Sequence, residues 1–436
     1  MEQAFETHIS EAFPELLEES FLLACSAGLD STVLAHLFAK LGASFELAHC
    51  NFGLRGKESE GDREFVEQLG SDLGVKTYVK NFDTIGYVSK HKVSIQMAAR
   101  ELRYGWFDRL LASAPASYIV TAHHADDVLE TFLINLSRGS GLEGLCGIPA
   151  RSNAIRRPLL PFARQDLEAY AQKAGFAWRE DASNAGLTYL RNRFRHLSIP
   201  ALKEADPGFL DQFGKSVGFL EGSRGLIRAY MEALKKDLVQ QRNGDLCFSV
   251  SGIKSLNPLD AHLHELFKDY GFTDWRAVRD LLDGESGREV LAGTAYRLLR
   301  AHDELILRPF EPTKGGIFNW DGPNLPPGLP LHLKVESVNA PGPADPRVLF
   351  VDKETLNEGW TLRTWQKGDY FYPLGMLGRK RVSKFFRDSK LNRFAREDQW
   401  LLCSGPEIVW VVGLRADDRF KVTPSTKEIL KITWVD

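Results

Sequence analysis

The segment from residue 21 to about residue 136 alternates short apolar runs with stretches of helical periodicity. The apolar runs cover residues 21–25, 44–49, 76–82 and 118–122. Between them, apolar residues recur at spacings of three and four, as in Val33, Leu34 and Leu37, which places them on one face of a helix. Because parallel strands need long, usually helical connections, this alternation predicts an α/β fold with a parallel sheet.

A loop of small residues joins the first apolar run to the first helical stretch. Its residues are Ser26, Ala27, Gly28, Leu29, Asp30 and Ser31. Small residues let backbone N–H groups approach a phosphate, and the helix N-terminus adds about half a positive charge. The loop has no lysine and is too short for the G-x-x-x-x-G-K-[ST] pattern of a Walker A loop. A plain strand-to-helix turn, capped by Ser26 or Asp30, explains the hexapeptide about equally well.

A chain of 436 residues is too long for one core and is expected to form several domains. We predict an α/β domain over residues 1–205 and a small, mainly helical middle domain over residues 206–308. Residues 309–346 are rich in proline and glycine, which mark a boundary. Residues 347–436 contain strand-like runs and are predicted to form a β-rich α+β C-terminal domain.

Composition excludes several classes of protein. The longest apolar runs are far shorter than the roughly 20 residues that cross a bilayer, so no membrane partner is expected. The first thirty residues contain seven acids and no lysine or arginine, unlike a signal peptide, so we expect a cytoplasmic protein. The five cysteines are widely separated and form no Cys-x-x-Cys pair, which predicts free thiols and no cysteine-bound metal.

Acidic side chains follow the apolar run at residues 118–122. Asp127 and Glu130 are three residues apart at the start of a helix, near the sheet edge where open α/β folds bind ligands. Such carboxylates can hold Mg²⁺ beside a nucleotide or orient an ammonium group. On the residues alone, acids that merely suit the helix dipole are the simpler interpretation. His123 and His124 lack the i,i+4 spacing of helical zinc motifs and are interpreted as polar pocket residues.

Two arginines, Arg100 and Arg103, share one side of the preceding helical stretch. A guanidinium group there can neutralise charge on a phosphate or contact an RNA backbone. The alternative is a solvated helix face, which is nearly as good an interpretation for Arg103 and a poorer one for Arg100.

Basic side chains are concentrated in residues 379–396, which hold eight lysines and arginines against one acid in a chain of net charge −3. Phe385, Phe386 and Phe394 are interspersed among them. Such a patch fits RNA, although charge runs are usually solvated faces. The predicted RNA contacts are Arg379, Lys380, Arg381, Lys384 and Arg387, with a second cluster at Arg191, Arg193 and Arg195.

Taken in order, these motifs resemble a known family. The hexapeptide is similar to the Ser-Gly-Gly-x-Asp-Ser signature of the PP-loop ATP pyrophosphatases, whose fold is adenine nucleotide α-hydrolase-like, with Ala27 at the second glycine. If that position needs a positive φ, alanine is strained. Within this group, the chain is similar to the tRNA(Ile)-lysidine synthases. The matching segments follow the family's order and cover residues 49–56, 99–104, 121–131, 138–145, 157–160, 180–184, 190–195, 367–369, 373–375 and 411–415.

The resemblance implies an ATP-dependent, AMP-forming ligase that adenylates C2 of the wobble cytidine in the CAU-anticodon isoleucine tRNA. The adenylation releases pyrophosphate. Free L-lysine then displaces AMP to give lysidine. The resemblance further implies that Asp30, Arg100, Asp127 and Glu130 are catalytic, that residues 26–31 bind ATP, that magnesium lies near Asp127 and Glu130, and that the two basic clusters bind tRNA. It is compatible with a homodimer. The alternatives are a thiolase-type PP-loop transferase and an inactive nucleotide- and RNA-binding protein.

Overall fold

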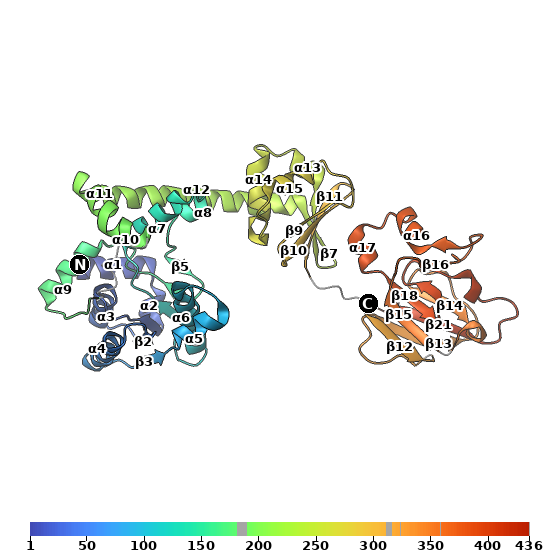
Figure 1. Cartoon of the computed structure of the whole chain (residues 1–436), viewed down its shortest axis with the longest axis horizontal. Coiled ribbons are helices and arrows are strands. Elements are labelled where there is room, and N and C mark those ends of the chain that lie inside the picture. The colour runs from blue at the N-terminus through green and yellow to red at the C-terminus, as the bar shows by residue number, and fades with distance from the viewer. Residues whose placement is uncertain (181–189, 311–315, 323, 358, 436) are drawn as a thin grey trace. The chain divides into compact units, whose positions relative to one another are not determined.

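The computed structural model describes residues 1–180, 190–310, 316–322, 324–357 and 359–435 (Figure 1). All but the first residue of the motif at 180–184 lies outside the described residues, as do positions 311–315 and 323 of the predicted boundary. The chain divides into two compact units, Met1–Arg228 and Ala229–Asp436.

The first unit is built on a six-stranded sheet in the order β3-β2-β1-β4-β6-β5. Its strands are β1 (Phe21–Ala24), β2 (Phe45–Asn51), β3 (Thr77–Asn81), β4 (Tyr118–Val120), β5 (Arg151–Ser152) and β6 (Ile155–Arg156). All neighbours run parallel except β5, which pairs antiparallel with β6. The first four strands coincide with the predicted apolar runs to within a few residues, and the predicted parallel sheet is confirmed.

Helices cover both faces of this sheet because alternate strand residues point to opposite sides. Phe21 and Leu23 of β1 pack in one core with α1 (Glu2–Ala12), α3 (Leu29–Leu41), α4 (Lys57–Leu73) and α9 (Arg164–Ala174). Leu22 packs on the other side against Trp106 and Phe107 of α6 (Ile95–Leu111). The apolar residues that the sequence predicts on the buried face of α3, such as Leu34, are fully buried.

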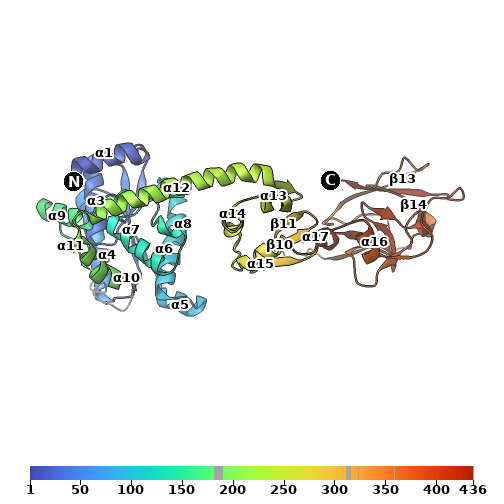
Figure 2. The ribbon, with the colours of Figure 1, turned by 90° about the horizontal axis from the view of Figure 1, so that it is seen from above.

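The last helices of the first unit pack beside α7 (Ala125–Ser137). They are α10 (Leu190–Arg193), the π-helical turn η2 (Phe194–Ser198), α11 (Ile199–Ala205) and the beginning of α12 (Phe209–Leu238). Phe213 and Val217 of α12 share a small core with Val128 and Leu129 of α7. The long helix α12 continues past the residue at which the two units divide (Figure 2).

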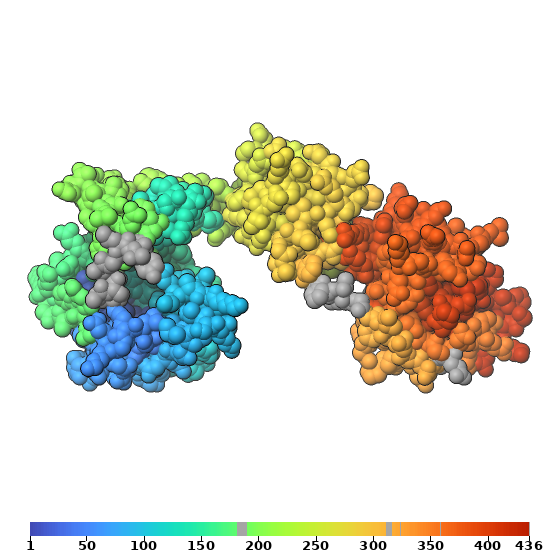
Figure 3. Space-filling model, viewed as in Figure 1, coloured from blue at the N-terminus to red at the C-terminus, as the bar shows by residue number. Residues whose placement is uncertain are grey.

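The middle segment contains the expected helices and, in addition, a five-stranded antiparallel sheet in the order β7-β8-β11-β10-β9. Its strands are β7 (Val239–Arg242), β8 (Asp245–Ser249), β9 (Glu289–Ala292), β10 (Tyr296–Ala301) and β11 (Glu304–Pro309), and its helices are α13 (Val250–Lys254), α14 (Leu259–Phe267) and α15 (Trp275–Asp280). One apolar core joins the helices to the sheet, and Figure 3 shows the segment in yellow as a filled globule.

The C-terminal segment is β-rich, as predicted. One sheet has the order β12-β15-β18-β19-β20 and another the order β13-β21-β14. Their strands are β12 (Ile317–Asp321), β13 (His332–Val338), β14 (Val348–Asp352), β15 (Gly359–Thr364), β18 (Trp400–Ser404), β19 (Glu407–Val411), β20 (Arg415–Ala416) and β21 (Ile429–Val435). A two-stranded ladder of β16 (Tyr370–Phe371) and β17 (Lys380–Arg381) leads into helices α16 (Val382–Asp388) and α17 (Arg393–Glu397).

The proline- and glycine-rich segment predicted as a boundary contains β12 and β13. Both lie at the edges of their sheets, where prolines at strand ends do not interrupt a ladder. Across the described part of the chain, every helix is too short or too polar to cross a membrane.

Candidate active site

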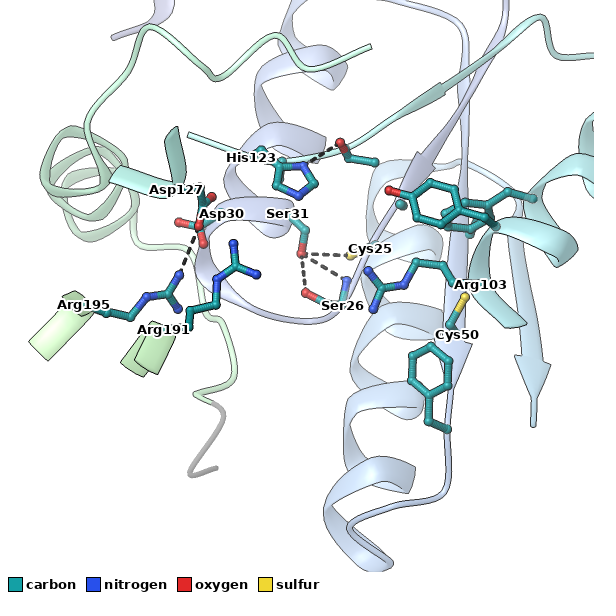
Figure 4. Close-up of a pocket in the computed structure, with 17 residues that line it drawn as sticks. Cys25, Ser26, Asp30, Ser31, Cys50, Arg103, His123, Asp127, Arg191 and Arg195 are labelled. Atoms are coloured by element: carbon teal, nitrogen blue, oxygen red, sulfur yellow. Dashed lines mark hydrogen bonds and ion pairs between the residues drawn. The ribbon is translucent and has the colours of Figure 1, made fainter. Parts of the chain in front are cut away.

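A cavity of about 430 Å³ opens at the carboxyl ends of β1, β2 and β4 (Figure 4). Residues from five parts of the first unit meet there: the loop after β1, the end of β2, helix α6, the segment around α7 and the segment around α10. The polar lining side chains include Ser26, Asp30, Ser31, Cys50, Arg103, Tyr104, Thr121, His123, Asp127, Arg191 and Arg195. The cavity therefore occupies the sheet edge at which open α/β folds bind ligands.

The loop of residues 26–31 is folded around the hydroxyl group of Ser31 (Figure 4). Ser31 Oγ accepts a hydrogen bond from the Ser26 N–H at 3.1 Å and donates one to the carbonyl oxygen of Gly28 at 3.1 Å. Gly28 caps α3, so the first N–H groups of this helix have no partner within the helix. A closed loop followed by free helical N–H groups is the arrangement that binds phosphates.

Ala27 adopts a left-handed backbone conformation, with a φ of 68°, and is fully buried. The position thus has the positive φ at which alanine is strained. For a residue with a Cβ atom this conformation costs about 1–2 kcal/mol. The carbonyl oxygen of Ala27 accepts the N–H of Arg179 at 3.0 Å, which helps to hold the loop in place.

A buried histidine links the loop to α7. His124 is 1% exposed, and its Nε2 lies 3.6 Å from Asp30 Oδ2 and 3.4 Å from Asp127 Oδ2. Burial opposes charge on His124, but the close contact with Asp30 and the charges of Asp127, Asp30 and Asp126 outweigh burial and raise its pKa. Burial likewise opposes ionisation of Asp30, yet the interaction with His124 and the charges of two arginines lower the pKa of this carboxyl group. The pair therefore favours an imidazolium beside a carboxylate.

The neighbouring His123 has the opposite character. Its Nδ1 lies 2.9 Å from Thr121 Oγ1, and its other ring nitrogen points into the cavity (Figure 4). Burial, helped by the charges of Arg157, Arg191 and Arg103 and opposed by that of Asp127, lowers the pKa of His123 to about 4. At neutral pH the ring is uncharged, so it can accept a hydrogen bond.

Two arginines from the end of the first unit bind the carboxylates of α7. Glu130 is 1% exposed and accepts hydrogen bonds from Arg191 and, at 2.8 Å, from Arg195. Arg195 also donates to Asp127 Oδ1 at 3.0 Å. Burial opposes the charge of Arg195, but Glu130 and Asp127 raise its pKa. The structure thus brings two predicted catalytic residues together with two predicted RNA contacts, whereas Arg193 is exposed and is not among the lining residues.

The two candidate arginines of α6 differ in position. Arg103 lines the cavity, while Arg100 is exposed, stacks on the ring of Tyr104 at 4.8 Å and is not among the lining residues. Neither Arg103 nor His124 was in the predicted catalytic set. Their sequence signals were present, as a second arginine one turn along the helix and as a His-x-Asp-Asp run, but neither signal says which side chain faces a ligand.

No group of three or more His, Cys, Asp and Glu side chains within the described ranges is arranged to hold a metal ion. Asp127 Oδ1 accepts from Arg195, Asp127 Oδ2 accepts from the His124 N–H at 3.1 Å, and both oxygens of Glu130 accept from arginines. By contrast, Asp30 Oδ1 is buried and has no hydrogen-bond partner among the described residues. Asp30 therefore has an oxygen atom to offer a cation.

The predicted basic patch lies on β17 and α16. Arg379, Arg381, Lys384 and Arg387 are exposed, while Lys380 pairs with Asp388 at 2.6 Å. The interspersed Phe385, Phe386 and Phe394 are at most 8% exposed and belong to the apolar cores. The patch therefore presents cations to a partner, without these aromatic rings.

A closed loop before a helix N-terminus, at the carboxyl edge of a parallel sheet and beside a polar cavity, is the arrangement of a nucleotide-using PP-loop protein. Residues 1–202 match the family model described as PP-loop domain, residues 241–310 the TilS substrate binding domain, and residues 360–434 the TilS substrate C-terminal domain. The tRNA(Ile)-lysidine synthase of Parabacteroides distasonis is 36% identical over 422 residues, covering 95% of each chain. That of Porphyromonas gingivalis strain W83 is 38% identical over 424 residues, covering 92% of this chain and 91% of the relative. The chain belongs to the tRNA(Ile)-lysidine synthase family, which confirms the resemblance found in the sequence.

Proposed function

We propose that this ATP-dependent ligase joins free L-lysine to C2 of the wobble cytidine in the CAU-anticodon isoleucine tRNA. The observation that carries the proposal is the loop of residues 26–31, which contributes Ser26, Asp30 and Ser31 to the lining of a cavity of about 430 Å³. The reaction needs ATP because a pyrimidine carbonyl oxygen leaves only after it has been converted to an adenylate.

In the first step, the N–H groups at the start of α3 hold the phosphates of ATP. Arg103, Arg191 and Arg195 line the same cavity and supply positive charge while pyrophosphate leaves. Asp30, at the start of α3, is fixed by His124 and faces this reaction. Arg100 stays a predicted catalytic residue: it is exposed and stacks on Tyr104, which lines the cavity.

In the second step, the lysine amine attacks C2, a C–N bond forms, and AMP leaves with the former carbonyl oxygen. The attacking ammonium must first lose a proton. His123 is neutral and presents a ring nitrogen to the cavity, so it can accept a hydrogen bond from the amine (Figure 4). Its lowered pKa makes it a weak base, so the proton passes to solvent. Asp127 lines the cavity, and Glu130 lies behind it. Both carboxylates can orient the lysine by charge.

Magnesium is the further component that we propose. An ion carried partly by ATP needs only one or two protein carboxylates, and the Asp30 oxygen that has no partner among the described residues fits that requirement. Asp127 would join it only if Arg195 moved away. Glu130 would contribute only if its arginines moved away. When bound, Mg²⁺ would offset the negative charge of the phosphates.

The two basic clusters are the proposed tRNA contacts. Arg191 and Arg195 lie at the cavity, where the wobble base must arrive, and the exposed cations of β17 and α16 are available to a phosphate backbone. A cytoplasmic location follows from the proposed substrate and can be checked by cell fractionation. A homodimer is one assembly to test, by analytical ultracentrifugation.

The direct test is mass analysis of the wobble nucleoside after the full chain has been incubated with tRNA transcript, ATP and labelled lysine. We expect lysine in the nucleoside and one AMP formed for each lysine incorporated. Asp30→Asn should abolish both while the protein remains folded. AMP formed equally well without RNA would contradict the proposal.

A thiolase-type transferase is the enzymatic alternative. Two cysteines, Cys25 and Cys50, line the cavity, but burial raises the pKa of Cys50 to about 12 and also raises that of Cys25. Both thiols therefore stay protonated and are poor nucleophiles. Incorporation of sulfur instead of lysine would favour this alternative, and tight tRNA binding without AMP formation would favour an inactive binding protein.

A further inference from the structure

A second cavity, of about 400 Å³, lies in the first unit. Its walls come from α1, from the segment of residues 149–161, and from α12. The charged and polar lining residues are His8, Glu11, Arg151, Arg157, Glu221 and Arg224. Among the described residues, none lines both this cavity and the cavity of the candidate active site.

The most unusual wall residue is Arg157, a cation that is only 6% exposed. Its Nη1 donates to the carbonyl oxygen of Pro149 at 2.7 Å, and its guanidinium group hydrogen-bonds to the side chain of Tyr104. Both partners are uncharged, and Nε has no hydrogen-bond partner among the described residues. Burying a cation without a counter-ion is costly, so the site favours an anionic ligand group beside Arg157.

Other wall residues favour a positive group instead. His8 hydrogen-bonds to the backbone of Pro158, while its Nε2 is buried without a partner in the described part of the chain. Burial lowers the pKa of His8, so the neutral ring presents Nε2 as an acceptor. The carboxylates of Glu11 and Glu221 line the same cavity. Glu221 already lies 3.6 Å from the guanidinium group of Arg224, so His8 and Glu11 are the groups that match an ammonium ion.

Between the two kinds of polar group the wall is apolar, with Phe13, Leu160 and Pro161 among its residues. We infer that this cavity binds a zwitterionic α-amino acid with an extended side chain. Its carboxylate would meet Arg157, its ammonium group His8 and Glu11, and its aliphatic carbons Phe13 and Leu160. A simple anion would face Glu11 and Glu221, and a simple amine would leave Arg157 without a counter-ion. The volume lies within the usual range for small-ligand sites.

The cavity is connected to the active site through one side chain. Arg157 bonds to Tyr104, which lines the nucleotide cavity, and its charge also acts on His123. A carboxylate bound at Arg157 would offset that charge. Occupancy of the second cavity is therefore expected to change the nucleotide affinity of the first.

Calorimetric titration of the full chain with L-norleucine tests this inference. Norleucine has the required carboxylate, ammonium group and alkyl chain but lacks the side-chain amine of the proposed co-substrate, so the result does not depend on lysidine synthesis. We expect one site per chain, and binding at least about tenfold weaker for Glu11→Gln. Glu6→Gln, an exposed position on the same helix, is the matched control and should leave binding unchanged.

Hexanoate and pentylamine, which each lack one charge, should bind at least about tenfold more weakly than norleucine. Arg157→Lys should remove binding and also the effect of norleucine on ATP affinity. If thermal melting shows that this variant does not fold, the double variant Glu11→Gln, Glu221→Gln replaces it in the norleucine titration. The inference is overturned if the folded wild type binds no norleucine at about 10 mM, if Glu11→Gln binds it normally, if hexanoate binds equally well, or if cytidine binds in its place.

Discussion

At the scale of single residues, the loop of residues 26–31 contains an alanine in a conformation that glycine prefers. Ala27→Val places a β-branched side chain at a φ of 68° in a fully buried position. We expect this variant to lose about 2 kcal/mol or more of unfolding free energy and to lose ATP binding. Urea unfolding and nucleotide titration measure the two effects.

Ala27→Gly is the control for this prediction. Relief of about 1–2 kcal/mol of strain is opposed by a more flexible unfolded chain and by loss of a buried methyl group, each worth somewhat under about 1 kcal/mol. The unfolding free energy should therefore stay within about 1 kcal/mol of the wild type. If the valine variant were as stable as the glycine variant, the left-handed conformation would not constrain this position.

The pH dependence of stability should reveal the buried His123. Its pKa of about 4 in the folded protein lies below the value of about 6.5 in an unfolded chain. Between these pH values the unfolded chain binds a proton that the folded chain does not, so stability rises with pH. His123→Gln should remove a contribution on the order of 3 kcal/mol from this rise.

Denaturation at several pH values between about 4 and 7 measures this slope. His124 contributes with the opposite sign, because its raised pKa adds stability below pH 6.5 that is lost as pH rises through the folded value. Exposed His91→Gln is the matched control and should leave the slope unchanged. An unchanged slope in His123→Gln would contradict the burial of a neutral ring.

The sequence patterns predicted which residue types form the site better than they predicted where each side chain points. Asp30, Ser31 and Asp127 were expected at a ligand site, and all three line the cavity. Arg100 was preferred over Arg103 as a catalytic residue, yet of these two arginines only Arg103 lines the cavity. The two residues are one helical turn apart, and a small difference in helix orientation decides which of them faces a ligand. A single sequence does not contain that information.

At the scale of elements, α7 is tied to α10 and η2 by charge. Glu130→Gln keeps the shape of the side chain but removes the carboxylate that holds Arg191 and Arg195. Because the carboxylate is buried and its partners are partly exposed, we expect a loss of about 1–3 kcal/mol and at least about tenfold lower turnover. Thermal unfolding and AMP release measure the two effects.

Glu143→Gln is the matched control for that variant. Glu143 is half-exposed and meets Arg224 at 3.5 Å, so its loss should cost less than about 0.5 kcal/mol. Equal effects of the two substitutions would show that the buried cluster has no special role.

The long alternation of apolar runs and helices made the first sheet predictable, whereas the middle sheet was missed. Its strands β7 and β8 are only four and five residues long, and helices separate them from β9. Apolar runs of that length do not distinguish strand from buried helix. The phenylalanines of α16 and α17 were similarly ambiguous, because helical spacing beside cations fits both a core and an RNA surface. The fold buries them.

At the scale of the whole molecule, a net charge of −3 means that RNA binding must depend on local patches. We predict that the triple variant Arg381→Gln, Lys384→Gln, Arg387→Gln weakens tRNA binding. The slope of log affinity against log salt should fall by about one for each phosphate that the variant no longer neutralises. Filter binding at several salt concentrations measures both effects.

A variant with the same change of charge elsewhere separates patch from net charge. Lys57, Lys80 and Lys173 are exposed on the first unit, and their replacement by glutamine should leave the slope nearly unchanged. If both triple variants behaved alike, overall charge and not the basic patch would determine binding.

The ion pairs that hold Arg191 and Arg195 against Glu130 and Asp127 affect the order in which the substrates bind. Before a nucleotide arrives, Glu130 and Asp127 already neutralise the guanidinium groups that an incoming triphosphate needs. Phosphates that capture the arginines release those two acids, which then become attractive to an amine. We therefore expect ordered assembly, with lysine affinity rising at least about tenfold once a non-hydrolysable ATP analogue is bound. Equilibrium dialysis of labelled lysine, with and without the analogue, measures this partner exchange.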